Sequence, residues 1–80
     1  LMITPEKHLD LNNSVLRVAA LLLRLLRRKR VITMDEGIAS VERKLGKQTT
    51  LVFTPALNLL FLLGKVEYFS PTDTLEYLGR

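Results

Sequence analysis

Residues Ala19–Arg30 read AALLLRLLRRKR, an apolar run that passes into a cluster of cations. A helix this apolar has more apolar circumference than a small domain can easily cover. A chain of 80 residues forms one such domain and buries only about 60% of its unfolded surface. We therefore expect a chain that packs against something else.

The composition agrees with that expectation, because 48% of the residues are hydrophobic and some of them must lie at an interface. The absence of cysteine favours a reducing cytoplasm. The net charge of +4 admits an acidic protein or a nucleic acid as partner. The longest apolar stretch, Val18–Leu23, is far shorter than the roughly 20 residues that cross a bilayer. Charges follow this stretch instead of preceding it, so we expect neither a membrane span nor a signal peptide.

Outward from the opening stretch, we predict an N-terminal arm over residues 1–11 and one domain over residues 12–80. The first helix is expected from Asn12 to Arg28. Its polar positions recur at the helical period and form one narrow stripe. They are Asn13, Arg17, Arg24 and Arg28.

Residues 33–36, Thr-Met-Asp-Glu, match the capping box that begins a helix. They follow Val31-Ile32, which is long enough for a minimal strand. The second helix is predicted over Met34–Leu45, with Ile38, Val41 and Leu45 on its buried face. Gly46 then supplies a left-handed stop.

Residues 47–50 read as a polar connector before a third helix. Thr54 is expected to cap this helix and Pro55 to occupy its first position. The helix should span residues 55–63, or begin a turn earlier at Leu51, and end at Gly64.

A β-hairpin is expected after the third helix, because residues 66–69 and 74–78 alternate around turn residues 70–73. Tyr68 shares a face with Val66, while Phe69 shares the other face with Glu67. We therefore expect one of these two aromatic side chains to face the core. The fold class is mostly α with a small β-hairpin, in the order of a winged helix-turn-helix domain.

The third helix is unsuited to reading DNA. Direct readout requires cationic or amide side chains that point at base edges. Asn58 is the only polar side chain between Pro55 and Leu63, and no cation lies between Gln48 and Lys65. We expect this helix to be divided between the domain core and a partner interface.

The cationic cluster leaves three interpretations open. It can be a solvated helix end that complements the helix dipole, a contact for an acidic protein, or a grip on phosphates without sequence reading. No aromatic residue lies among these cations, which removes an argument for base stacking. The candidate contacts are Arg24, Arg27, Arg28, Lys29 and Arg30.

No catalytic, cofactor or metal site is predicted. His8 is the only histidine, and a lone histidine without cysteine or a carboxylate cluster favours neither a metal site nor a general base. The serines have no histidine at an interpretable position, and the glycines form no phosphate loop. We expect a protein that is not an enzyme.

Three segments resemble one protein family: Lys7–Leu11, Ser14–Leu16 and Phe53–Tyr68 (FTPALNLLFLLGKVEY), followed by Asp73-Thr74. They are similar to the small middle components of bacterial three-component ABC-ATPase systems, related to the Lamassu type. In such systems the component is encoded between an SMC-like ATPase and a variable effector. The resemblance implies a non-catalytic adaptor in an anti-phage or mobile-element defence complex.

Taken together, residues and resemblance predict a winged-helix adaptor that docks its apolar surface on the ATPase, the effector or a second copy. The expected contacts are Leu22, Leu26, Leu59, Phe61 and Phe69. Nucleic acid would be met through the complex and without sequence specificity. The alternatives are a DNA-binding regulator that uses the basic end of the first helix and the wing, and an antitoxin-like dimerising module.

Overall fold

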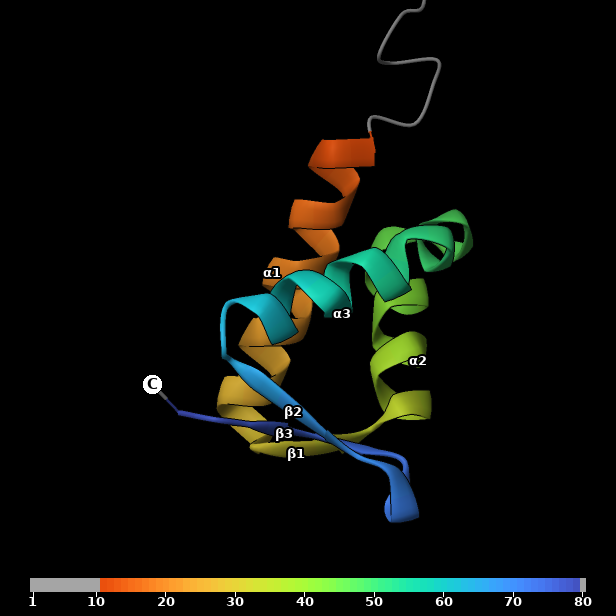
Figure 1. Ribbon diagram of the computed structural model, residues 1–80. Coiled ribbons are helices and arrows are strands. Elements are labelled where there is room, and N and C mark those ends of the chain that lie inside the picture. Colours follow the sequence, from red (N-terminus) through yellow and green to blue (C-terminus); the bar gives the residue numbers. More distant parts are fainter. Residues whose placement is uncertain (1–10, 80) are drawn as a thin grey trace, which may run out of the picture.

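The computed structural model describes residues 11–79, so the predicted arm up to residue 10, with His8, lies outside the described residues. The elements are α1 (Leu11–Lys29), β1 (Val31–Thr33), α2 (Met34–Leu45), the 3₁₀ helix η1 (Lys47–Val52), α3 (Phe53–Leu62), β2 (Val66–Phe69), the 3₁₀ turn η2 (Ser70–Thr72) and β3 (Thr74–Tyr77). This order confirms a mostly helical domain with a small sheet (Figure 1). No helix in the described part is long and apolar enough to cross a membrane.

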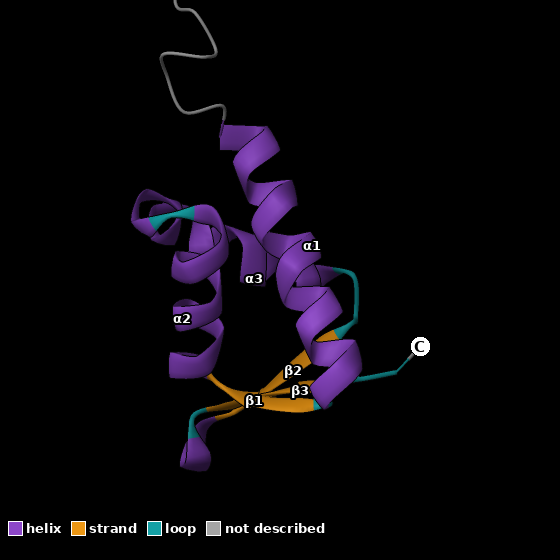
Figure 2. Cartoon of the chain, turned by 180° about the vertical axis from the view of Figure 1, so that it is seen from behind, coloured by secondary structure: helices purple, strands orange, loops and turns teal. Residues whose placement is uncertain are grey.

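The helices lie above the sheet, and α3 crosses in front of α1 and α2 (Figure 1). Seen from behind, α1 and α2 lie in front and α3 lies behind them (Figure 2). The core between them draws on every helix and strand. Its buried apolar residues are Val18, Ala19, Leu22, Leu26, Ile32, Val41, Val52, Phe53, Ala56, Leu57, Leu60, Val66 and Leu75.

The sheet is antiparallel, with β3 between β1 and β2. Ile32 pairs with Leu75, and both side chains are buried under the helices. The backbone N–H of Met34 donates to the carbonyl of Asp73 at 3.0 Å. The short strand and the hairpin are therefore joined in one sheet that also supports the start of α2.

The capping box of α2 is confirmed. The Glu36 backbone N–H donates to Thr33 Oγ1 at 3.0 Å, and the Thr33 backbone N–H donates to Glu36 Oε1 at 2.9 Å. The helix ends at Leu45 as predicted. Gly46 has a φ of 101° but a ψ of 155°, so it ends the helix with a positive φ outside the left-handed helical conformation that was expected.

The predicted connector at residues 47–50 and the predicted start of the third helix were wrong. Residues Lys47–Val52 form η1, in which the hydroxyl of Thr49 donates to the Gly46 carbonyl. α3 begins at Phe53 with no side-chain cap, so Thr54 does not cap it. Phe53 is buried in the core. This burial favours a helix that begins two residues before Pro55. Pro55 is tolerated because N–H groups in the first turn have no helical partner.

The expectation that one wing aromatic faces the core was also wrong. Val66 is buried, but the exposed fractions of Tyr68 and Phe69 are 42% and 55%. Ile32, Val66 and Leu75 already fill the sheet side of the core. The Tyr68 hydroxyl instead donates to the Asp73 carboxylate at the wing turn.

Candidate functional site

The structure divides the five predicted partner contacts. Leu22 and Leu26 have exposed fractions of 0% and belong to the core of this domain, so neither is on a surface that a partner can reach. Leu59 and Phe61 are half-buried and pack at the edge of the core. Phe69, the last residue of β2, is exposed. Leu22 and Leu26 are used internally because α1 packs against α3, η1, α2 and β3, whereas Leu16 of the same helix has an exposed fraction of 58%.

A larger apolar surface lies where α3 ends. The exposed fractions of Leu62 and Leu63 are 85% and 59%, and they stand three and four residues after Leu59, so the three share one side of the helix. We call Leu59, Leu62 and Leu63 the α3 face; Phe61, two residues after Leu59, lies on the other flank of the helix. The buried side of α3 consists of Phe53, Ala56, Leu57 and Leu60.

The sequence-based contact list missed Leu62 and Leu63. The signal that could have found them is the buried stripe itself, since Phe53, Ala56, Leu57 and Leu60 recur at the helical period. Leu62 lies opposite this stripe, together with Pro55 and Asn58. The outward side of α3 therefore carries no charged side chain.

Three of the predicted cations, Arg27, Arg28 and Lys29, lie in the last turn of α1; Arg24 precedes this turn and Arg30 follows the helix, and all five are exposed. Lys29 Nζ lies 3.6 Å from Glu36 Oε2, and the Arg30 guanidinium lies 5.4 Å from the centre of the Tyr77 ring. Arg30 has a φ of 74°, a left-handed conformation that turns the chain from α1 into β1. Charges at this end of α1 are favourable because they face the negative end of the helix dipole.

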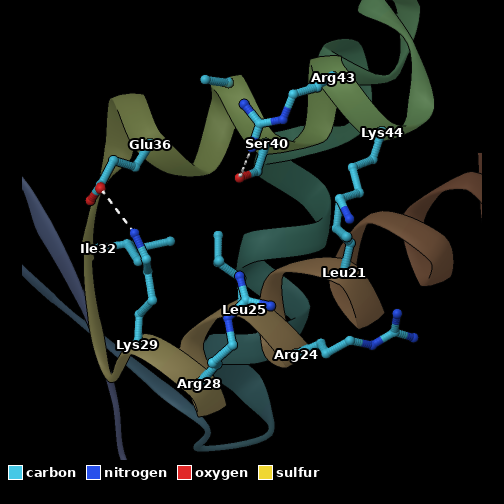
Figure 3. Close-up of a pocket in the computed structure, with 11 residues that line it drawn as sticks. Leu21, Arg24, Leu25, Arg28, Lys29, Ile32, Glu36, Ser40, Arg43 and Lys44 are labelled. Carbon is cyan, nitrogen blue, oxygen red and sulfur yellow. Dashed lines mark hydrogen bonds and ion pairs between the residues drawn. The ribbon is translucent and has the colours of Figure 1, made fainter.

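A groove of about 270 Å³ lies between α1 and α2 (Figure 3). Figure 3 looks into the groove with α3 behind it, and Lys44 reaches from α2 toward Leu21 on α1. Its lining combines an apolar floor with a cationic rim. The lining residues are Leu21, Arg24, Leu25, Arg28, Lys29, Ile32, Glu36, Ala39, Ser40, Arg43 and Lys44.

The groove uses only part of the predicted cluster and adds to it. Arg27 and Arg30 do not line it, whereas Arg43 and Lys44 of α2 do. Both belong to the basic last turn of α2, which is visible in the sequence. Only the packing of α2 beside α1 shows that these two basic helix ends border the same space.

Glu36 is the one carboxylate in the groove lining. The hydrogen bond from the Thr33 backbone N–H lowers the pKa of Glu36 below its usual value of 4.5, and the Lys29 ammonium acts in the same direction. This carboxylate is thus ionised and already engaged. On the wing, the hydrogen bond to the Asp73 carboxylate raises the pKa of the Tyr68 hydroxyl.

Residues 11–79 contain no group of three His, Cys, Asp or Glu side chains placed to hold a metal ion. What these residues present to a ligand is apolar surface and cationic side chains. Such groups bind and orient other molecules. The prediction that the chain is not an enzyme remains a prediction.

Comparison with known proteins places the chain in a family. Residues 30–78, from the end of the α1–β1 turn to the end of the wing, match the family model described as ABC-three component (ABC-3C) system Middle Component 8. No curated protein and no solved structure gives a significant match. The matched residues make up more than half of the chain, which therefore belongs to the Middle Component 8 family of ABC-three component systems.

Proposed function

We propose that this chain is a non-catalytic adaptor that joins the ABC ATPase of its system to an effector through protein–protein contacts. Membership of a middle-component family supports the proposal, because such a component belongs to a multi-protein system. In the full proposal the ATPase is SMC-like, and the system acts in the bacterial cytoplasm against phages or mobile elements, as the resemblance to Lamassu-related systems implies.

The winged helix-turn-helix assignment forms part of this proposal. Its support is the element order of helix, strand, helix, helix and hairpin, with β3 paired to both β1 and β2. In that architecture α3 occupies the position of the recognition helix. A recognition helix that reads DNA needs polar or cationic side chains on its outward side, and α3 carries Pro55, Asn58 and Leu62 there.

The exposure of Leu62 is the observation that carries the adaptor proposal. A leucine with an exposed fraction of 85%, next to a second exposed leucine on an uncharged helix, is typical of a surface that a protein partner covers. Burial of one leucine side chain contributes about 1.5–3 kcal/mol. Leu62 and Leu63 can therefore act as central contacts of such an interface.

The test is co-expression of the chain with the ATPase and effector components of its own system, followed by affinity purification and titration of the purified partners. Leu62→Glu is expected to weaken the association about tenfold or more. The matched control is Leu51→Glu on η1, which also replaces a largely exposed leucine (77%) by a charge but lies before α3. Equal effects of both variants, or no association of the unchanged chain, would contradict the proposal.

A DNA-binding regulator is the second candidate, and the exposure of Arg24, Arg27 and Arg28 favours it. Such a protein would bind a mixed-sequence duplex on its own, and its affinity would fall steeply with salt, with a slope of about −0.9 for each phosphate contact. The adaptor proposal expects little binding by the isolated chain. Duplex binding by the isolated chain that weakens steeply with salt would contradict the adaptor proposal and support the DNA-binding regulator.

A further inference from the structure

The groove between α1 and α2 has more positive charge than its own residues neutralise. Its rim carries five cations, Arg24, Arg28, Lys29, Arg43 and Lys44, against the single carboxylate of Glu36. Glu36 is engaged by Thr33 and Lys29. Among the described residues, the side chains of Arg24, Arg28 and Lys44 have no hydrogen bond or ion pair. An anionic occupant is therefore complementary to the rim.

The floor of the groove indicates which kind of anion fits. Leu21, Leu25, Ile32 and Ala39 provide apolar surface between the two basic helix ends. A nucleic-acid backbone is recognised by cations and hydrogen-bond donors and gains nothing from an apolar floor. A protein segment with acidic residues beside a large apolar side chain satisfies both the rim and the floor, in the manner of a helix or strand that lies in a groove.

The position of the groove suits a second docking surface, in addition to the outward side of α3. In Figure 3 the groove faces the viewer and α3 lies behind it, whereas α3 lies in front of α1 in Figure 1. Occupation of one surface thus leaves the other accessible. An adaptor requires two such surfaces to hold two components at once.

We propose that the α1–α2 groove binds an acidic segment of one of the other components of the system, with an apolar side chain of that segment on Leu21, Leu25 and Ala39 and its carboxylates on Arg28 and Lys44. This inference rests on the proposed adaptor function and names the chemistry of one of its two contacts. The groove is just below the size of small-molecule sites, about 300–1,000 Å³, and admits one or two side chains.

Two variants and one control test the groove in the co-expressed complex at about 0.15 M salt, where the Debye length is about 8 Å. Arg28→Glu reverses a charge at the rim. Ala39→Arg places a long side chain in the groove and adds a positive charge, and arginine is compatible with the helix α2. Arg27→Glu makes the same charge change one residue away, outside the groove lining. We expect Arg28→Glu and Ala39→Arg to weaken binding of one component about tenfold, and Arg27→Glu to change it much less.

Zero-length carbodiimide cross-linking of the same complex identifies the occupant. In the free chain Lys29 should cross-link to Glu36, which verifies the chemistry. In the complex Lys44 should cross-link to carboxylates of a partner segment that also contains a large apolar residue.

The outcomes separate the two proposals. Association that is sensitive to Leu62→Glu but insensitive to both groove variants, with no cross-link from Lys44 to a partner, would overturn the groove proposal alone. DNA binding that Arg28→Glu abolishes and Ala39→Arg strengthens would assign the groove to nucleic acid and overturn it as well. Failure of the components to associate at all would overturn both proposals.

Discussion

α1 and α3 are both rich in leucine and pack against each other, yet they place their leucines differently. In α1 the leucines at 22 and 26 are completely buried, and the cations lie outside. In α3 the buried stripe from Phe53 to Leu60 is complete, and Leu62 remains in solvent. A helix with a polar stripe can assign all of its apolar positions to one core. A helix with almost no polar residues must leave some apolar side chains outside.

This difference corrects a natural inference from composition. The excess of leucine in the chain was expected to produce contact surfaces on both α1 and α3. The structure buries Leu22 and Leu26 of α1 in the core, whereas Leu16 of α1 is exposed, as are Leu62 and Leu63 at the end of α3. The exposed surface of α1 also carries cations, and three of them, Arg24, Arg28 and Lys29, line one groove with the basic end of α2.

Core substitution in α1 should have the largest effect. Leu22→Ala is expected to lower the free energy of unfolding by about 2–5 kcal/mol, because it leaves a cavity at a fully buried position. That is a large part of the roughly 4–12 kcal/mol expected for a domain of this size. Leu62→Ala should change the free energy of unfolding by no more than about 0.5 kcal/mol.

Urea denaturation followed by circular dichroism measures both variants, and an unchanged slope with denaturant would show that the comparison is of folded-state packing. Comparable losses for Leu22→Ala and Leu62→Ala would remove the distinction between the two helices. They would also show that Leu62 is packed within the domain.

Substitutions just after the two helices should change the free energy of unfolding by an intermediate amount. α1 is followed by Arg30 with a φ of 74°, and α3 by Gly64 with a φ of 71°. Gly64→Ala adds a Cβ that meets no atom within 4 Å, so its expected cost of about 1 kcal/mol comes from the backbone conformation alone.

Arg30 already carries this backbone cost, and its contact with the Tyr77 ring offsets it by about 0.5–1 kcal/mol. Arg30→Gly should therefore leave the free energy of unfolding within about 0.5 kcal/mol of the unchanged protein, while Arg30→Ala should lower it. Thermal and urea denaturation of the three variants provide the measurement. If Arg30→Gly were as destabilising as Arg30→Ala, the backbone explanation would be wrong.

The smallest expected effect concerns how the helices begin. α2 begins with a charged capping box, while α3 begins with no side-chain cap. Because the folded protein lowers the pKa of Glu36 below 4.5, this carboxylate stabilises the fold above that pH. Its contribution is lost as the pH falls through the lowered pKa.

Comparison of the unchanged protein with Glu36→Gln by urea denaturation, from about pH 6 to pH 3, isolates this contribution. The difference in the free energy of unfolding between the unchanged protein and Glu36→Gln should be constant well above pH 4.5 and shrink in acid. A difference that grows on acidification would have the wrong sign for a stabilised carboxylate.

The sequence alone determined the features that depend on neighbouring residues. Thr33 and Glu36 specify the start of α2 because each satisfies a backbone N–H of the other's residue. The polar stripe from Asn13 to Arg28 specifies α1. The uncharged third helix predicts, before any coordinate is known, that this helix does not read DNA sequence.

Tertiary structure alone decided which apolar residues became core and which became surface. Leu22 and Leu62 are the same residue on two leucine-rich helices, and the packing of α1 against α3 buries the first and leaves the second in solvent. The same holds for Arg28 and Lys44, which are distant in the chain and line one groove because α1 and α2 pack side by side. The physical reason is that capping and turn interactions act within a few residues, whereas burial depends on contacts between distant parts of the chain.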